Sequence, residues 1–232
     1  MVFHAQMDIL FEDNHLIAVN KKNNELVQGD KTRDISLDVS LKDYLKEKYN
    51  KPGNVFLGVI HRLDRPVSGV VIFARTSKAL SRMNRMFREG QVKKEYWAIV
   101  KNKPPEDAGT LIHFIAKNEK QNKSFCHTSP VKNSREAVLT YHIIGKSDNF
   151  YLLGIDLKTG RHHQIRAQLA TVGCPVKGDL KYNYPRSNTG GGISLHARYI
   201  EFIHPVKNEP VKITASVPDD DPLWRYFNKD LI

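Results

Sequence analysis

Hydrophobic positions recur with helical spacing in four stretches of the chain. In the first stretch, Leu37, Leu41 and Leu45 share one face behind Ser36, a suitable N-cap residue, and Pro52-Gly53 ends the segment. The same reasoning predicts three more helices: from Thr76 or Ser77 to Gly90, from Gly160-Arg161 to Gly173, and after Asp219-Asp220-Asp221, where Trp224 and Phe227 form a docking face.

Runs of alternating or β-branched residues between these helices predict strands. They cover residues 10–19, 55–60, 69–74, 96–100, 109–116, 137–144 and 151–157, with turns at 21–24 and 145–149. Because no regular helical crossovers separate the strands, we expect an α+β fold with a mixed, largely antiparallel central sheet flanked by helices and loops. No repeat or linker divides the chain, so we expect one domain over residues 1–232.

The charge of the chain narrows the class of partner. Its 36 Lys and Arg against 25 Asp and Glu give a net charge of +11, which favours a polyanion such as RNA, although charge alone also serves solubility. The longest apolar runs, such as 70–74, are far shorter than the roughly 20 residues that cross a bilayer. The N-terminus does not resemble a secretory signal. We therefore expect a cytoplasmic protein without a membrane partner, in which Cys126 and Cys174 are reduced structural thiols.

A basic stripe runs along the second predicted helix. Arg82, Arg85 and Arg88 share its polar face and are candidates for contacts with RNA phosphates. A solvated surface without a binding role is the alternative.

The segment from His61 to Gly69 is the candidate for chemistry. Asp64 lies between Arg62 and Arg65, and Pro66 and Gly69 restrict the backbone on the C-terminal side. Neighbouring guanidinium groups favour an ionised carboxylate at neutral pH, which suits a nucleophile or a stabiliser of positive charge rather than a general acid. A salt bridge that only orders the loop is the alternative.

Four further segments accompany this loop in a fixed order. The five segments are His61-Arg62-Leu63-Asp64 with Ser68-Gly69, Lys94-Glu95-Tyr96-Trp97-Ala98, Thr159-Gly160-Arg161-His162-His163-Gln164-Ile165-Arg166, Gly173-Cys174-Pro175-Val176-Lys177-Gly178-Asp179, and Leu195-His196-Ala197 through His204-Pro205. In order and spacing they resemble the motifs of the RluA-type RNA pseudouridine synthases. The resemblance covers about Leu10 to Val217 and is to the stand-alone catalytic form without an S4 domain, because Asp64 lies near the start of the sequence.

The resemblance implies a pseudouridine synthase fold and a role for each motif. Asp64 would be the catalytic residue, Tyr96 would pack against the target base, and Arg166 would pair with Asp64. Arg62 would fill the gap left by a flipped base or hold a phosphate. From the residues alone, Tyr96 also fits an ordinary core aromatic, and Arg166 also fits a surface helix charge.

The implied reaction isomerises uridine in rRNA or tRNA and needs no cofactor and no metal. The histidines support this expectation: His162 and His163 should point in different directions on a helix, and His142, His196 and His204 are scattered over predicted strands. Gly190-Gly191-Gly192 is too short for a phosphate cradle. A monomer is the simplest expectation.

The chain departs from the family pattern at three places. Lys21-Lys22-Asn23-Asn24 replaces a Lys-Pro-x-Gly turn, Val67 stands where a Thr is usual, and His162 replaces another Thr. These departures bear on the first turn and on hydrogen bonds around Asp64.

Two rival functions stay open at this stage. A catalytically silent RNA-binding protein would keep the basic surface but lose the active carboxylate. A base-releasing glycosidase or nucleosidase also passes through a cationic ribose, but it usually needs a second acid or base to activate water.

Overall fold

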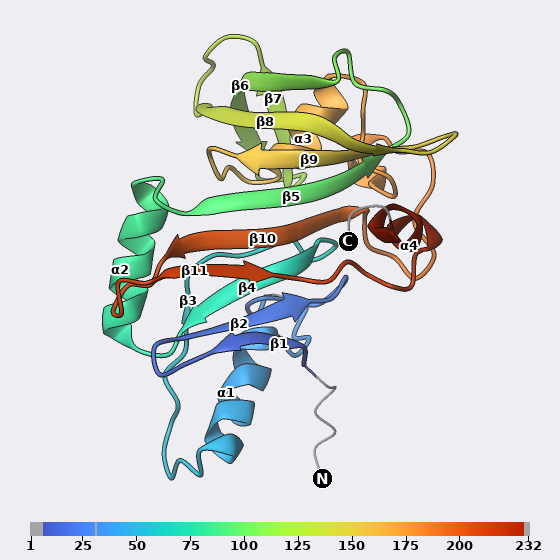
Figure 1. Ribbon diagram of the computed structural model, residues 1–232. Coiled ribbons are helices and arrows are strands. Elements are labelled where there is room, and N and C mark those ends of the chain that lie inside the picture. The colour runs from blue at the N-terminus through green and yellow to red at the C-terminus, as the bar shows by residue number, and fades with distance from the viewer. Residues whose placement is uncertain (1–6, 31, 230–232) are drawn as a thin grey trace. The chain divides into compact units, whose positions relative to one another are not determined.

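The computed structural model describes residues 7–30 and 32–229. Its helices are α1 (Leu37–Lys48), α2 (Ser77–Arg88), α3 (Gln164–Thr171) and α4 (Pro222–Lys229), with a 3-10 turn at Leu180–Tyr182. Its strands are β1 (Ile9–Glu12), β2 (Leu16–Lys21), β3 (Gly58–Val59), β4 (Ser68–Ala74), β5 (Lys93–Val100), β6 (Ala108–Asn118), β7 (Lys123–His127), β8 (Arg135–Lys146), β9 (Tyr151–Leu157), β10 (Leu195–Ile203) and β11 (Pro210–Thr214) (Figure 1).

The residues gather into two compact units. Unit 1 consists of the described residues up to Val92 together with Tyr199–Ser216. Unit 2 consists of Lys93–Arg198 and the described residues from Val217 onward. The strand β10 therefore passes from unit 2 into unit 1. Each unit has its own buried cluster of side chains, and one functional domain over 1–232 stays a prediction.

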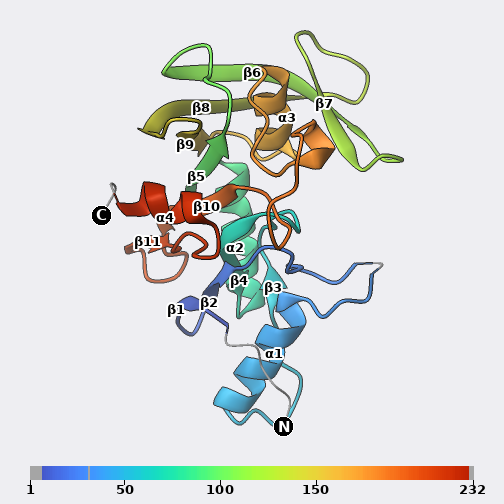
Figure 2. The same cartoon turned by 90° about the vertical axis from the view of Figure 1, so that its right-hand side faces the viewer.

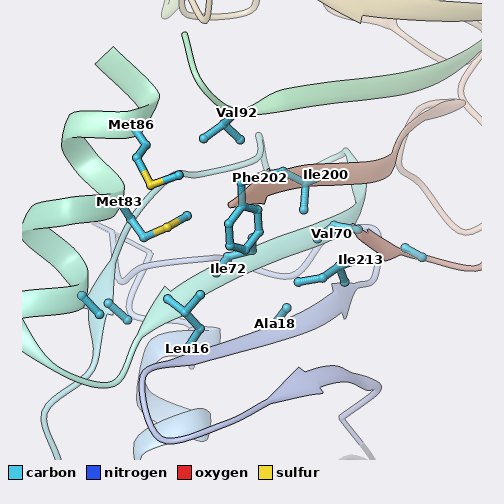
Figure 3. Close-up of a cluster of buried hydrophobic side chains, with 13 residues drawn as sticks. Leu16, Ala18, Val70, Ile72, Met83, Met86, Val92, Ile200, Phe202 and Ile213 are labelled. Atoms are coloured by element: carbon cyan, nitrogen blue, oxygen red, sulfur yellow. The ribbon is translucent and has the colours of Figure 1, made fainter. Parts of the chain in front are cut away.

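Unit 1 is built on antiparallel strands around β4, whose seven residues are all buried. One edge of β4 pairs with β2, which in turn pairs with β1, and β11 pairs with the last residues of β10. Figure 3 shows Met83 and Met86 of α2 pointing toward Phe202 of β10 and Ile72 of β4. Burying each such side chain contributes about 1.5–3 kcal/mol, so this cluster fixes α2 on the sheet.

Both helices of unit 1 follow the predicted pattern. The helix α1 begins after Ser36 and buries Leu37, Leu41 and Leu45, as its spacing predicts. The helix α2 begins after Thr76, whose side-chain oxygen accepts a hydrogen bond from the Ala79 N–H at 3.1 Å. The helix α2 is thus set by a side-chain cap and an apolar stripe, whereas Ser36 occupies the N-cap position of α1 without capping it and donates its hydroxyl to Asp38 instead.

Unit 2 contains an antiparallel sheet with the strand order β5, β9, β8, β6, β7. The helix α3 lies against β6 and β7 (Figure 2). Trp224 and Phe227 of α4 are buried with Trp97 and Leu152, which confirms the predicted docking face. The fold class is confirmed, because every named strand pair with a described register is antiparallel and helices accompany both units.

Three strand predictions need correction. The single strand predicted over 10–19 is split between β1 and β2, because the Asp13 carboxylate accepts the N–H groups of His15 and Leu16 at 2.8 Å and makes a turn. The strand predicted over 55–60 is reduced to Gly58–Val59. The strands β7 and β11 were not predicted. The sequence of β7 lacks a clear alternation of apolar and polar residues, whereas Val211-Lys212-Ile213-Thr214 of β11 does alternate and was overlooked.

Two further expectations concern the thiols and the membrane. Cys126 and Cys174 are unpaired, as expected, and Cys174 is buried. In the part of the chain that the structure describes, no helix is both long enough and apolar enough to span a bilayer.

Candidate active site

Asp64 lies in unit 1 on the loop between β3 and β4. The Val67 N–H donates a hydrogen bond to the Asp64 carbonyl oxygen at 3.0 Å, which closes a tight turn directly after the carboxylate. Leu63 and Val67 are buried on either side, whereas Asp64 is half-buried. Gly69 enters β4 with a φ of +115°, a conformation that strains any residue with a side chain. The sequence around Asp64 therefore holds the backbone in one conformation.

Lys21, at the end of β2, holds this turn in place through hydrogen bonds to its main chain. Its side chain is fully buried, and its ammonium donates to the carbonyl oxygens of Lys22, Arg65 and Val67 at 2.9, 3.0 and 2.6 Å. Burial lowers the pKa of Lys21 to about 8, and the negative charges of Glu25 and Asp64 oppose that shift. The Lys21 side chain is therefore protonated at neutral pH, and all three protons of its ammonium group are donated to carbonyl oxygens.

The turn after Lys21 also contacts the Asp64 loop. Asn24 adopts a φ of +68° and donates its N–H to the Arg65 carbonyl oxygen at 2.9 Å. The Lys22 N–H donates to the Glu25 carboxylate at 2.7 Å. Asn tolerates the left-handed conformation better than most residues. The departure from Lys-Pro-x-Gly therefore still gives a turn that docks on the loop.

The two arginines beside Asp64 have different surroundings. Arg65 forms an ion pair with Asp34 at 2.7 Å, and both side chains are exposed, so the pair contributes little stability. Arg62 is exposed, and its guanidinium makes no hydrogen bond or ion pair with any residue that the structure describes. The neighbouring His61 is held by the Ile72 N–H, which donates to its Nε2 at 3.1 Å, and its ring stacks on Phe87. The predicted role of Arg62 in holding the substrate stays a prediction.

Tyr96 lies in unit 2 on β5, opposite Ile155 of β9. It is half-buried, and its neighbour Trp97 is buried in the cluster with Leu152 and Trp224. Because side chains alternate along a strand, Tyr96 projects from the sheet face opposite Trp97. Its role as the wall for a target base stays a prediction.

Arg166 is nearly inaccessible in the first turn of α3, with 4% of its surface exposed, so the alternative of a surface helix charge is wrong. Its Nε and Nη2 donate to the two carboxylate oxygens of Asp179 at 2.7 and 2.9 Å. The guanidinium also lies 5.2 Å from the centre of the Tyr182 ring. The sequence-based prediction that Arg166 pairs with Asp64 joins residues of the two units and stays a prediction.

Hydrogen bonds from side chains fix the start of α3. The Gln164 side-chain oxygen accepts from the Thr159 hydroxyl at 2.8 Å and from the Arg161 N–H at 3.0 Å, and its amide donates to the Val138 carbonyl at 3.1 Å. His163, directly before the helix, has a φ of +53°. Backbone strain of this kind persists only where the surroundings enforce it. These contacts place Arg166 relative to the sheet of unit 2.

The expectation that His162 and His163 point in different directions is wrong. Both precede α3 rather than lie on it, and their rings stack with centres 3.8 Å apart. The Ser124 hydroxyl donates to the His162 carbonyl at 2.7 Å and lies 2.9 Å from His162 Nδ1. His162 therefore supplies a contact with β7 at the position where the family usually has a Thr.

His163 stays neutral at physiological pH. Burial and the nearby charge of Arg166 lower the pKa of His163 to about 2. Its Nδ1 lies 3.1 Å from the Tyr182 hydroxyl, which donates to the Ser124 carbonyl at 3.1 Å and accepts from the Ser124 N–H at 2.9 Å. Tyr182 thus links the neutral ring of His163 to the main chain of β7.

The remaining histidines have mixed surroundings. His196 and His204 are fully buried, and His204 Nδ1 accepts the N–H groups of Val206 and Lys207 at 3.2 and 2.9 Å. His142 is exposed. Across residues 7–30 and 32–229, no three His, Cys, Asp or Glu side chains come together in a way that could hold a metal ion.

The basic stripe on α2 is not uniform. Arg82 is half-buried and donates through Nη1 to the Pro205 carbonyl oxygen at 2.7 Å, so it fastens the turn after β10. Arg85 and Arg88 are exposed. Only the latter two have the freedom expected of contacts with a phosphate backbone.

Comparison with known proteins places these motifs in a family. A family model described as RNA pseudouridylate synthase matches residues 15–171. A tRNA pseudouridine synthase C of Haemophilus ducreyi is 32% identical over 246 residues, covering 97% of this chain and 96% of the relative. A ribosomal large subunit pseudouridine synthase C of Rickettsia prowazekii is 30% identical, covering 90% of this chain and 68% of the relative.

Two further comparisons bear on length and fold. An uncharacterized RNA pseudouridine synthase of Synechocystis is 31% identical over 91% of this chain, which spans 66% of that relative. The solved structure of human RNA Pseudouridylate Synthase Domain Containing 4 has a TM-score of 0.78 at 22% identity, with 96% of this chain and 93% of the other covered, and it supports the fold alone. The family predicted from the five motifs is confirmed, and its enzyme class is that of an isomerase. The chain belongs to the RNA pseudouridylate synthase family.

Proposed function

We propose that the protein converts uridine to pseudouridine in structured rRNA or tRNA, with Asp64 as the catalytic carboxylate. Relatives whose names specify ribosomal or transfer RNA support this class of substrate. The net charge of +11 supports a polyanionic partner. The observation that carries the proposal is the turn at Asp64. It contains the family motif, and the buried ammonium of Lys21 holds its main chain at Arg65 and Val67.

The chemistry requires an ionised carboxylate next to a ribose. The bond between uracil N1 and ribose C1′ breaks, the base rotates, and a bond forms between uracil C5 and the same ribose carbon. The hydrogen on C5 leaves as a proton and N1 ends protonated, so the net change is an isomerisation. A carboxylate at the ribose acts as a nucleophile or stabilises the positive charge that develops when the base departs.

We propose that three other residues position the substrate. A stacked uridine is out of reach, so the base must be extruded and held against a wall, which we assign to Tyr96. The donors of Arg62 suit a phosphate or the gap left by the flipped base. Arg166 would pair with Asp64 and keep it charged, in addition to the hydrogen bonds that its Nε and Nη2 donate to Asp179.

These roles make residues 1–232 a single catalytic domain. Asp64 and Arg62 come from unit 1, whereas Tyr96 and Arg166 come from unit 2. One chain supplies every residue in the scheme, so a monomer suffices. Light scattering during size-exclusion chromatography of the active fraction should give the mass of one chain, and a larger mass would contradict that expectation.

Release of tritium tests the proposed reaction. Cellular RNA labelled at uracil C5 is incubated with the wild-type protein or with Asp64→Asn, and the radioactivity released to water is counted. We expect release by wild type, a loss of at least about 1,000-fold in Asp64→Asn, and RNA affinity within a few-fold, because the substitution leaves phosphate contacts in place.

Each rival function gives a different result. Release by neither protein with intact RNA binding identifies a silent RNA-binding protein. Free uracil among the products identifies a glycosidase. Equal loss of binding and activity in Asp64→Asn makes Asp64 a structural residue.

A further inference from the structure

An open cavity of about 430 Å³ lies in unit 1 beside the segment that leads to Asp64. Its polar lining comes from Gln28 after β2, from Asp38 and Lys42 on α1, and from Arg62. Its apolar lining includes Leu57 and Ile60 around β3. A volume within the range of roughly 300–1,000 Å³ found for ligand sites is large enough for one nucleotide.

The polar groups of this cavity have free hydrogen-bonding capacity. Among the residues that the structure describes, Gln28 and Arg62 make no side-chain hydrogen bond. Lys42 lies 3.6 Å from the Asp38 carboxylate, and 40% of its side chain is exposed, so this contact is weak. Asp38 accepts a hydrogen bond from the Ser36 hydroxyl and keeps further lone pairs. The imidazole of His61 also lines the cavity, but its Nε2 accepts from the Ile72 N–H and its ring stacks on Phe87. The cavity thus offers two cations, an amide and a carboxylate beside this imidazole.

We propose that this cavity receives a single nucleotide of the substrate RNA, next to the target uridine. The inference rests on the proposed function and adds a recognition subsite to it. Arg62 lines the cavity and is two positions before Asp64, a span of at most about 7 Å along the chain. The cavity and the catalytic loop are therefore close enough for consecutive nucleotides of one strand.

The mixture of charges specifies the kind of nucleotide. A bare anion would meet the Asp38 carboxylate as well as the two cations, whereas a nucleotide separates its phosphate from its base. Lys42 and Arg62 suit the phosphate, and Leu57 and Ile60 suit the face of a base. The Asp38 carboxylate accepts hydrogen bonds only, so it favours a base with an amino group over uracil, whose one base donor, N3–H, lies between two carbonyl oxygens that repel a carboxylate.

Variants of two lining residues test the subsite. Gln28→Trp fills the cavity from an exposed position, and Lys42→Ala removes a cation. The matched control is Lys46→Ala, which removes an exposed lysine of the same helix that does not line the cavity. The probes are unfractionated tRNA and ribosomal RNA labelled at uracil C5, with KM and kcat from tritium release and Kd from filter binding in the Asp64→Asn background.

We expect Gln28→Trp to raise KM and Kd at least tenfold and Lys42→Ala about fivefold, with kcat within twofold. Lys46→Ala should stay within twofold of wild type in every quantity. Thermal unfolding midpoints equal to wild type separate this effect from a loss of folding. Values of KM and Kd for both lining variants that match Lys46→Ala overturn the inference and leave the proposed function standing.

Mapping of the modified sites gives a second test. Uridines modified by wild type should share an amino-bearing base at one neighbouring position, and Asp38→Ala should relax that preference at least fivefold. A preference that Asp38→Ala leaves unchanged overturns the assignment. If wild type releases no tritium at all, the proposed function fails, and the Kd values of Gln28→Trp and Lys42→Ala alone decide whether RNA occupies the cavity.

Discussion

The turn that contains Asp64 is held through main-chain atoms, whereas the helix that contains Arg166 is held through side-chain atoms. In unit 1, the ammonium of Lys21 binds main-chain carbonyls of the loop, including those of Arg65 and Val67. In unit 2, Arg166 is held by the side chain of Asp179, and the residues before it are held by the side chains of Thr159, Gln164 and Tyr182.

The difference determines which substitutions matter. A carbonyl oxygen is present whatever the side chain, so Arg65 and Val67 can change without removing a contact to Lys21. Among side chains, Lys21 then carries the anchoring of the loop, because the bond from Asn24 to Arg65 joins main-chain atoms only. The start of α3 depends on several side chains, each of which can be removed separately, and we expect substitutions there to be costly at more positions.

Removal of the Asp179 carboxylate should give the largest effect. Asp179→Ala removes the carboxylate that accepts from two nitrogens of the buried Arg166 guanidinium, which costs about 3–5 kcal/mol of unfolding free energy. The control is Asp34→Ala, which removes the partner of Arg65 from an exposed pair and should cost at most about 1 kcal/mol. Urea unfolding measures both, and similar losses would show that burial does not distinguish the two pairs.

Lys21→Met should have the next largest effect. Three carbonyl oxygens lose the Lys21 ammonium, but those of Lys22 and Arg65 keep the N–H groups of Glu25 and Asn24, so the cost of about 1–3 kcal/mol for an unsatisfied group falls on Val67. The two other lost bonds add to this cost and relief of the buried charge offsets part of it, so we expect a net loss of about 2 kcal/mol. Turnover should fall at least tenfold because the Asp64 turn loses its support. Lys22→Ala, at the exposed neighbouring position, is the control. A kcat of Lys21→Met equal to that of wild type would mean that the Asp64 turn keeps its conformation without Lys21.

The two regions should also differ in their response to pH. The pKa of Lys21 is lowered to about 8, so its ammonium is present below that pH and is lost above it. We expect kcat/KM to fall as the pH rises through about 8, by roughly tenfold for each further unit. His163, with a pKa near 2, does not change charge in this range.

Lys21→Met has no proton to lose at this position. Its kcat/KM should be low at all pH values and should lack the decrease near pH 8. A decrease that persists in this variant would have to come from another group.

The smallest effect concerns the basic stripe on α2. Arg85→Ala should weaken RNA binding about threefold and reduce the slope of log Kd against log salt by about one, because one phosphate contact is lost. Arg82→Ala should instead lower thermal stability, since it releases the Pro205 carbonyl. An unchanged salt slope in Arg85→Ala would identify the stripe as a solvated face.

Sequence analysis predicted correctly those features that depend on residues close together in the chain. The starts of α1 and α2 follow from apolar spacing and, in α2, from the cap residue Thr76. Asp64 was singled out as a candidate from residues that adjoin it in the chain and from the family motifs, and its role stays a prediction. The role of Lys21 was missed because its carbonyl partners at Arg65 and Val67 lie 44 and 46 positions away. The Gly-Cys-Pro motif includes Asp179, but the sequence did not predict its pairing with Arg166, because that pairing depends on the path of the chain after α3.

The passage of β10 between the units has a consequence for the order of folding during synthesis. The sheet of unit 2 is contiguous in sequence from β5 to β9, so its strands can pair as soon as they leave the ribosome. The core of unit 1 requires Ile200, Phe202 and Ile213, which are made more than a hundred residues after β4. The nascent chain therefore completes the core of unit 1 only after the strands of unit 2 have been made, and a ribosome that stalls before residue 199 leaves that core open.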